Sequence, residues 1–175
     1  LGWADCDIYL DSKIIAECMM EDGHEKLEKH LDEMEQTLAE HGIPAKCYQE
    51  MMFILPVSFG ENEGNNICIF QGTGSTMDMY EYTAGTAPQG TDEIAITRIA
   101  ADKLNATIGD TVTIKTIDGD KEYIISAFFQ SMNMMGSGIR LHTDAYINYV
   151  QAGSGGNTQI TFTDHPDSRE IERRM

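Results

Sequence analysis

The dipeptide Asp118-Gly119 separates two segments in which apolar and polar residues alternate, Thr111–Ile117 and Asp120–Phe129. This combination is the strongest short-range signal for a β-hairpin, because Asp-Gly suits the positive φ angles of a two-residue type I′ turn. The sequence therefore predicts a hairpin over residues 111–129.

The register of this hairpin follows from the turn. A two-residue turn at Asp118-Gly119 places apolar residues opposite one another on one face and a charge pair on the other. The predicted cross-strand pairs are Ile114 with Tyr123, Val112 with Ile125, and Lys115 with Glu122.

A long helix is predicted from Gly23 to His41. Asp22 and Glu25 resemble a capping box at its start, and Gly42 and Pro44 follow its end. Its apolar stripe has helical spacing and consists of Leu27, Leu31, Met34 and Leu38.

Shorter elements alternate along the rest of the chain, which indicates an α+β fold. Thr97 suits the N-cap of a helix over Arg98–Leu104, and Asn105 suits its left-handed end. Ile14–Met20 is apolar but ambiguous. Further helices are predicted from Thr143 or Asp144 to Val150 and from Asp167 onward. The predicted strands are Ala4–Leu10, Lys46–Leu55, Ile67–Phe70, Glu93–Ile96, Ile139–His142 and Gln159–Thr163.

Glycine-bearing segments mark turns and links. Gly109-Asp110 is predicted to turn the chain into the hairpin, so that Gly109, Asp110, Asp118 and Gly119 specify the fold and carry no chemistry. Gly72–Ser75 and Gly153–Gly156 are predicted to be flexible links, and we regard them as candidate hinges.

The net charge of −17 excludes some partners. Binding to nucleic acid or to anionic lipid needs Lys and Arg, so neither is expected. The charge is typical of a solubilising surface, and it is also compatible with a cationic partner.

The longest apolar run, Met51–Val57, is far shorter than the roughly 20 residues of a membrane helix. The chain begins at Leu1 rather than Met, and we interpret it as a piece of a longer protein.

The four cysteines all lie in the first 70 residues. None form C-x-x-C, so the sequence does not indicate a zinc ribbon or a thioredoxin-type site. Three disulfide pairings and four free thiols all remain open.

Catalytic signatures are incomplete. His24-Glu25 begins like a zinc-protease motif, but His30 is six residues away, which rotates it by about 240° around a helix. We interpret both histidines as surface residues. Gly72-Thr73-Gly74 has Met77 where a dinucleotide loop needs its third glycine, and no Walker or G-x-S-x-G sequence exists. We predict no catalytic residue, no cofactor and no metal site, and hence no enzyme.

One short segment, Met132, Asn133, Met134 and Met135, contains three thioether side chains in four residues. The methionines have three interpretations: packing of one or two of them into the core with the rest incidental, an adaptable contact surface for a partner or a lipid-like substrate, and Cu(I) binding. We take these four residues as the candidate contact site.

A family resemblance emerges in residues 85–136. The segment contains G-x-x-P, then D-E-I, a strand, a short helix ending in Leu, I-G-D, a hairpin and a polar loop with Asn and Gly. The matching positions are Gly85, Pro88, Asp92, Glu93, Ile94, Ala100, Leu104, Gly109, Asp110, Asn133 and Gly136. This pattern resembles the extracytoplasmic, MacB-type periplasmic core domain of FtsX-like ABC-transporter permeases.

The resemblance implies an architecture and a role. Residues 1–71 and 151–175 are expected to form a membrane-proximal α/β lobe of βαβ type, and 72–150 an inserted small β-rich lobe. The implied role lies at the extracytoplasmic face of the bacterial cell membrane. There the domain couples a cytoplasmic ATPase partner to the export or extraction of a peptide, lipoprotein or antimicrobial substrate, or to mechanical signalling. Family members often work as permease homodimers or heterodimers. The alternative is a free-standing secreted or surface module that binds a cationic peptide or a metal.

Overall fold

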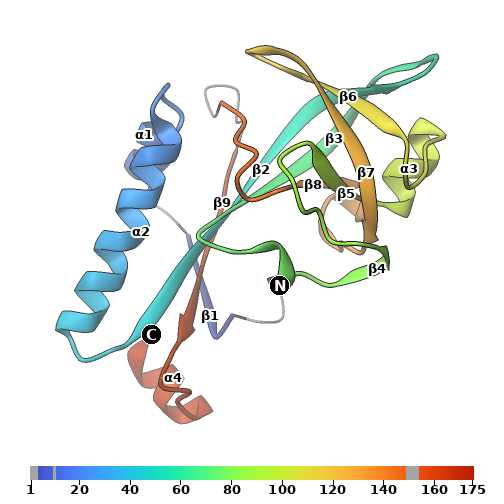
Figure 1. Cartoon of the computed structure of the whole chain (residues 1–175). Coiled ribbons are helices and arrows are strands. Elements are labelled where there is room, and N and C mark those ends of the chain that lie inside the picture. Colours follow the sequence, from blue (N-terminus) through green and yellow to red (C-terminus); the bar gives the residue numbers. More distant parts are fainter. Residues whose placement is uncertain (1–3, 10, 149–153) are drawn as a thin grey trace.

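The computed structural model of the chain describes residues 4–9, 11–148 and 154–175. It confirms the α+β class, with three of the described helices near the ends of the chain and one, at 98–104, within the strand-rich body (Figure 1). The helices are α1 (Ser12–Cys18), α2 (Gly23–Glu40), α3 (Arg98–Leu104) and α4 (Ser168–Arg174), with short 3-10 turns η1 (Met77–Met79) and η2 (Asn133–Gly136). The strands are β1 (Cys6–Tyr9), β2 (Ala45–Phe59), β3 (Asn62–Thr73), β4 (Tyr82–Gly85), β5 (Glu93–Thr97), β6 (Thr111–Thr116), β7 (Gly119–Phe129), β8 (Gly138–Leu141) and β9 (Ser154–Phe162).

The described strands form one sheet in the order β1-β9-β2-β3-β8-β5-β7-β4, and β6 pairs with both β2 and β7. Because β6 joins β7 back to β2, the strands β2, β3, β8, β5, β7 and β6 close into a barrel-like ring. The long strand β2 connects the two regions, since Ala45 pairs with Phe162 of β9 and Val57 pairs with Ile114 of β6.

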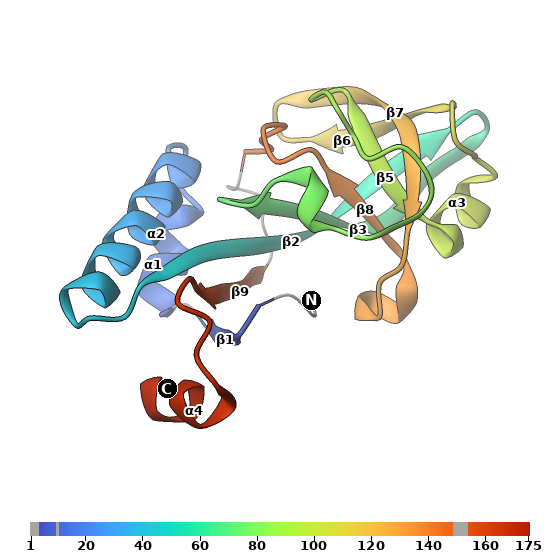
Figure 2. The same cartoon turned by 60° about the horizontal axis from the view of Figure 1, so that its bottom comes forward.

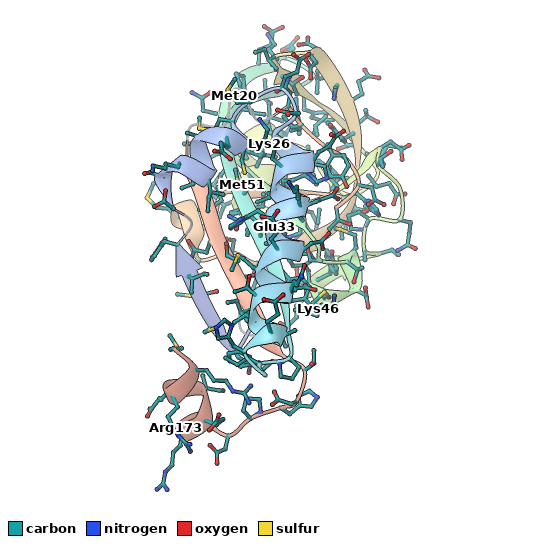
Figure 3. The ribbon with its side chains drawn as sticks, turned by 90° about the vertical axis from the view of Figure 1, so that its left-hand side faces the viewer. Met20, Lys26, Glu33, Lys46, Met51 and Arg173 are labelled. Atoms are coloured by element: carbon teal, nitrogen blue, oxygen red, sulfur yellow. The ribbon has the colours of Figure 1, made fainter. Side chains whose placement is uncertain are left out.

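Helices α1 and α2 cover one face of the part formed by β1, β9 and β2 (Figures 1 and 3). The predicted stripe explains this packing: Leu27 and Leu31 are buried, with Leu27 in the same apolar cluster as Met51 and Phe53 of β2. Charged residues such as Lys26 and Glu33 lie along the same helix (Figure 3). Asp22 makes no side-chain cap and instead pairs with Lys26 at 2.9 Å, which corrects the predicted capping box.

The predictions for α3 are confirmed in detail. The Thr97 hydroxyl accepts a hydrogen bond from the Ala100 N–H at 3.3 Å, and Asn105 ends the helix with a φ of 59°. The turn that follows has Gly109 at a φ of 97°, and the Asp110 carboxylate accepts a hydrogen bond from the Thr107 N–H at 2.8 Å.

The hairpin of β6 and β7 is confirmed, but its predicted register is wrong. Val112 pairs with Tyr123 and Lys115 with Asp120, so each residue meets a partner two positions earlier than expected. The reason is local. A type I′ turn requires positive φ at both central residues, but only Gly119 has one, at 111°. The turn therefore consists of Ile117 and Asp118, and Gly119 already belongs to β7.

Two predictions near the C-terminal end are also corrected. Residues 143–148 form a turn and an irregular segment instead of a helix, while 149–150 lie outside the described residues. The predicted link at 153–156 is mostly strand, because β9 begins at Ser154 and pairs with β2, and Gly153 is not described. Gly72 and Thr73 likewise lie in paired strand β3. Asp167 caps α4 by accepting a hydrogen bond from the Glu170 N–H at 2.9 Å.

All four cysteines are free thiols. Cys6 and Cys47 pair with Ile160 from opposite sides of β9. Two strand spacings place their Cα atoms about 10 Å apart, which is too far for a disulfide. Burial raises the pKa of Cys47 and of Cys68 to about 11.

Candidate functional site

The predicted contact residues lie in the loop between β7 and β8, around η2. Met132 is 99% exposed and Met135 is 93% exposed, so neither of these two side chains packs into the core. The side chains of Asn133 and Met134 lie outside the described part of the structure. The loop therefore presents at least two thioether side chains to the surroundings.

Fixed contacts hold the base of this loop. The Gly138 N–H donates to the Thr97 hydroxyl at 3.0 Å, and the Lys103 ammonium donates to the Ser137 hydroxyl at 3.3 Å. Gly136 has a φ of 77°, a backbone conformation that favours glycine, and an added Cβ would lie 2.9 Å from a methyl of Ile99. The exposed methionines thus stand on an anchored loop beside α3.

Two cavities flank the loop, each of about 520 Å³. They share the wall formed by Phe129, Gln130, Ser131 and Met132. The first cavity extends toward Arg98 and Ile99 of α3. Ile99 is 48% exposed, so it forms an apolar surface next to the methionines.

The second cavity lies over the sheet face opposite α1 and α2. Strand pairing determines which residues line it: Gln159 of β9 lies between Asp7 of β1 and Tyr48 of β2, and Asn157 lies opposite Glu50. Asp7, Glu50, Asn157 and Gln159 all line this cavity. Its walls combine these polar groups with apolar ones from the loop and from β2.

A buried ion pair forms one wall of the second cavity. The Arg140 guanidinium donates two hydrogen bonds to the Glu50 carboxylate, at 2.6 and 3.0 Å, and the two side chains are 4% and 10% exposed. The guanidinium carbon also lies 3.8 Å from the centre of the Tyr80 ring. The Tyr80 hydroxyl lies 2.7 Å from that of Ser75 and donates to Glu50 at 3.4 Å.

Electrostatics are consistent with a tightly held pair. Burial acts to lower the pKa of Arg140, but the charge and the hydrogen bonds of Glu50 more than offset it, so the pKa is raised. Burial, together with the Glu50 charge, raises the pKa of Tyr80 to about 12. The guanidinium therefore stays charged and the phenol neutral, which fixes the shape of this wall.

Sequence reasoning missed this pair. The available signal was a charged residue inside each of two apolar strands: Glu50 before Met51-Met52, and Arg140 between Ile139 and Leu141. Such residues are rarely buried unless they are paired. The pairing itself was not accessible, because 90 positions separate the two residues.

The histidines show one further correction. His24 is half-buried, with its ring centre 3.4 Å from that of Tyr146 and its Nε2 atom 3.1 Å from Glu28. Among the described residues, no group of three or more His, Cys, Asp or Glu side chains is arranged to hold a metal ion. No helix in the described part of the chain has both the length and the apolar character of a membrane span.

This fold, with a barrel-like sheet extended by strands from both chain ends, is found in extracytoplasmic domains of transport proteins. The periplasmic region of MacB from Actinobacillus actinomycetemcomitans is similar over 82% of this chain and 69% of its own, with a TM-score of 0.57 and 12% identity. The extracellular domain of the ABC-type transporter YknZ from Gram-positive bacteria is similar over 94% of this chain and 77% of its own, with a TM-score of 0.53 and 12% identity.

A third solved structure, a domain of a protein described as a permease from Porphyromonas gingivalis, covers 79% of this chain and 71% of its own, with a TM-score of 0.52 and 10% identity. No protein-family model and no curated protein matches the chain by sequence. The resemblance seen in the sequence to extracytoplasmic domains of ABC-transporter permeases is thus confirmed at the level of the fold.

Proposed function

We propose that this chain is the extracytoplasmic domain of a bacterial ABC-transporter permease of the FtsX-like, MacB-type family. The observation that carries the proposal is the fold shared with the MacB and YknZ domains over 82% and 94% of the chain. The order of turns and caps between Gly85 and Gly136 gives support that does not depend on that comparison.

The proposed architecture has two lobes. Residues 1–71 and 151–175 contribute β1, α1, α2, β9 and α4, and these elements gather around the first half of β2 (Figure 2). Residues 72–150 contribute β4 to β8, of which β5 to β8 complete the barrel-like ring and β4 pairs with β7. Because β2 and β3 run through both regions, the lobes are expected to move together rather than to hinge freely.

The domain is proposed to act through shape and to make or break no covalent bond. A cytoplasmic ATPase partner supplies the energy through the membrane region of the permease, which works as a homodimer or a heterodimer. The loop with Met132 and Met135 is the proposed contact for a peptide, a lipoprotein or a lipid-like substrate. Flexible thioethers suit that task because they adapt to irregular apolar surfaces.

The topology of the full-length gene product tests this proposal. We would replace the exposed Asp120 by Cys and label intact cells with a membrane-impermeant maleimide. Labelling of the variant above the wild-type background, in a protein that stays in the membrane fraction, is expected. A free-standing module would instead be released into the medium, and a cytoplasmic domain would label only after lysis.

The contact loop has its own test. We expect the double variant Met132→Ser/Met135→Ser of the isolated chain to bind the neutral apolar dye N-phenyl-1-naphthylamine about three- to tenfold more weakly, because thioether contact area is lost. Met20→Ser is the matched control, since Met20 is 57% exposed and lies after α1, away from the loop. Equal loss in both variants would contradict a specific role for the loop.

A further inference from the structure

The second cavity carries unbalanced negative charge. Asp7 and Glu81, both exposed, line it together with Glu50. Arg140 is the only basic residue among its described lining residues, and its charge is matched by Glu50. The charges of Asp7 and Glu81 are therefore left without a cation in the cavity wall.

Gln159 provides an independent indication of a ligand. Its residue is only 5% exposed and it lines the same cavity. Within the ranges that the structure describes, its side-chain amide has no hydrogen-bond partner. Its amide atoms are not among the fully buried polar atoms that lack a partner, so the amide faces the open space of the cavity and can bind a group that enters there.

The cavity opens beside an unused sheet edge. Asp7 pairs directly with Gln159, and β1 pairs with β9 and with no other described strand. Figure 1 shows β1 at this end of the sheet, beyond β9. The outer backbone groups of an edge strand can bind an extended polypeptide, whose alternate side chains then lie over the sheet face.

We propose that the edge of β1 and this cavity together bind an extended segment of a partner protein that presents a lysine or arginine side chain. The backbone of the segment pairs with β1, and its cation lies between Asp7, Glu81 and the amide oxygen of Gln159. Met52 and Met132, which also line the cavity, contact the methylene stem, as is usual for long basic side chains. The inference does not depend on the proposed transport role, because the isolated chain is sufficient to test it.

Nuclear magnetic resonance titration of the ¹⁵N-labelled chain tests the proposal. The probes are the capped pentapeptide Ac-Thr-Val-Lys-Val-Thr amide, the same peptide with norleucine in place of lysine, and n-butylammonium chloride. The lysine peptide is expected to shift the amide signals of β1 and β9 saturably and to bind at least about tenfold more tightly than either other probe. The norleucine peptide lacks the charge, and butylammonium lacks the backbone.

Charge-neutral variants complete the test. Asp7→Asn and Glu81→Gln should each weaken binding of the lysine peptide about three- to fivefold, the effect of one partly exposed ion pair. Asp120→Asn is the control with the same change in net charge, and it should leave binding unchanged. Equal affinity for the lysine and norleucine peptides, or an equal loss in the control, would overturn the cation site. Equal affinity for butylammonium would overturn the role of the β1 edge, and absent shifts would overturn both.

Discussion

Replacing Arg140 by Met is expected to destabilise the fold strongly. The substitution keeps an unbranched side chain of similar length but removes the guanidinium that makes both hydrogen bonds to Glu50. The Glu50 residue is only 7% exposed, so its carboxylate would remain buried without an ionic partner. The contact between the guanidinium and the Tyr80 ring at 3.8 Å is lost as well.

The size of the effect follows from the burial. Removing one member of a buried ion pair costs about 3–5 kcal/mol, because the remaining charge is uncompensated. For a chain of 175 residues, this corresponds to a fall in Tm of about 6–20 °C. The double variant Glu50→Leu/Arg140→Met buries no charge, so its stability is expected to lie within about 2 kcal/mol of the wild type.

A double-mutant cycle in urea measures the coupling between the two residues. We expect the single variants Glu50→Leu and Arg140→Met to be non-additive by at least about 3 kcal/mol. The control cycle uses Lys29 and Glu33, an exposed pair at 3.5 Å, whose coupling should stay below about 0.5 kcal/mol. A coupling for the buried pair as small as that of the control would refute the reasoning.

Three other predictions concern close packing, thiols and alkali. Gly156→Ala should lower the free energy of unfolding in urea by several kcal/mol, because a Cβ there would clash with the Glu50 carbonyl. The control Gly90→Ala should change it by less than about 0.5 kcal/mol, because its close neighbour is the movable Asp92 carboxylate. Equal effects would contradict the close β2–β9 contact. Since burial raises the pKa of Cys47 and Cys68 to about 11, little thiolate exists at pH 8, and both should react with Ellman's reagent only after unfolding. The variant Cys6→Ser/Cys18→Ser leaves these two thiols alone, and their fast reaction in the native variant would contradict this. The pKa of Tyr80 of about 12 exceeds the unfolded value of about 10. The neutral phenol therefore contributes about 2–3 kcal/mol to the free energy of unfolding below pH 10, and this contribution is lost as the pH rises to 12. Tyr80→Phe should reduce the loss of stability between pH 10 and 12, and an unchanged pH profile would contradict the assignment.

Local signals in the sequence predicted local structure well. The helix Arg98–Leu104, its Thr97 cap and its left-handed Asn105 were all predictable, because each depends on residues within a few positions. The hairpin was predictable for the same reason, but its register was not. That register depends on whether Asp118 takes a positive φ, and the sequence alone favoured the wrong turn.

The features that define the site depend on distant residues. Gln159 lies between Asp7 and Tyr48 only because β9 inserts between β1 and β2. Nothing near Glu50 in the sequence points to Arg140. The methionine loop was found from its composition, but its exposure depends on how Gly138 and Thr97 anchor it to α3.

ATP hydrolysis by the complete complex is the most direct test of the transport role. The full-length gene product would be purified in lipid nanodiscs, and any associated ATPase would be identified and assayed. The account predicts a stable complex with a P-loop ATPase whose hydrolysis rate changes when residues 1–175 are deleted from the permease. Release of the gene product from cells as a soluble protein, with no ATPase bound, would contradict the account.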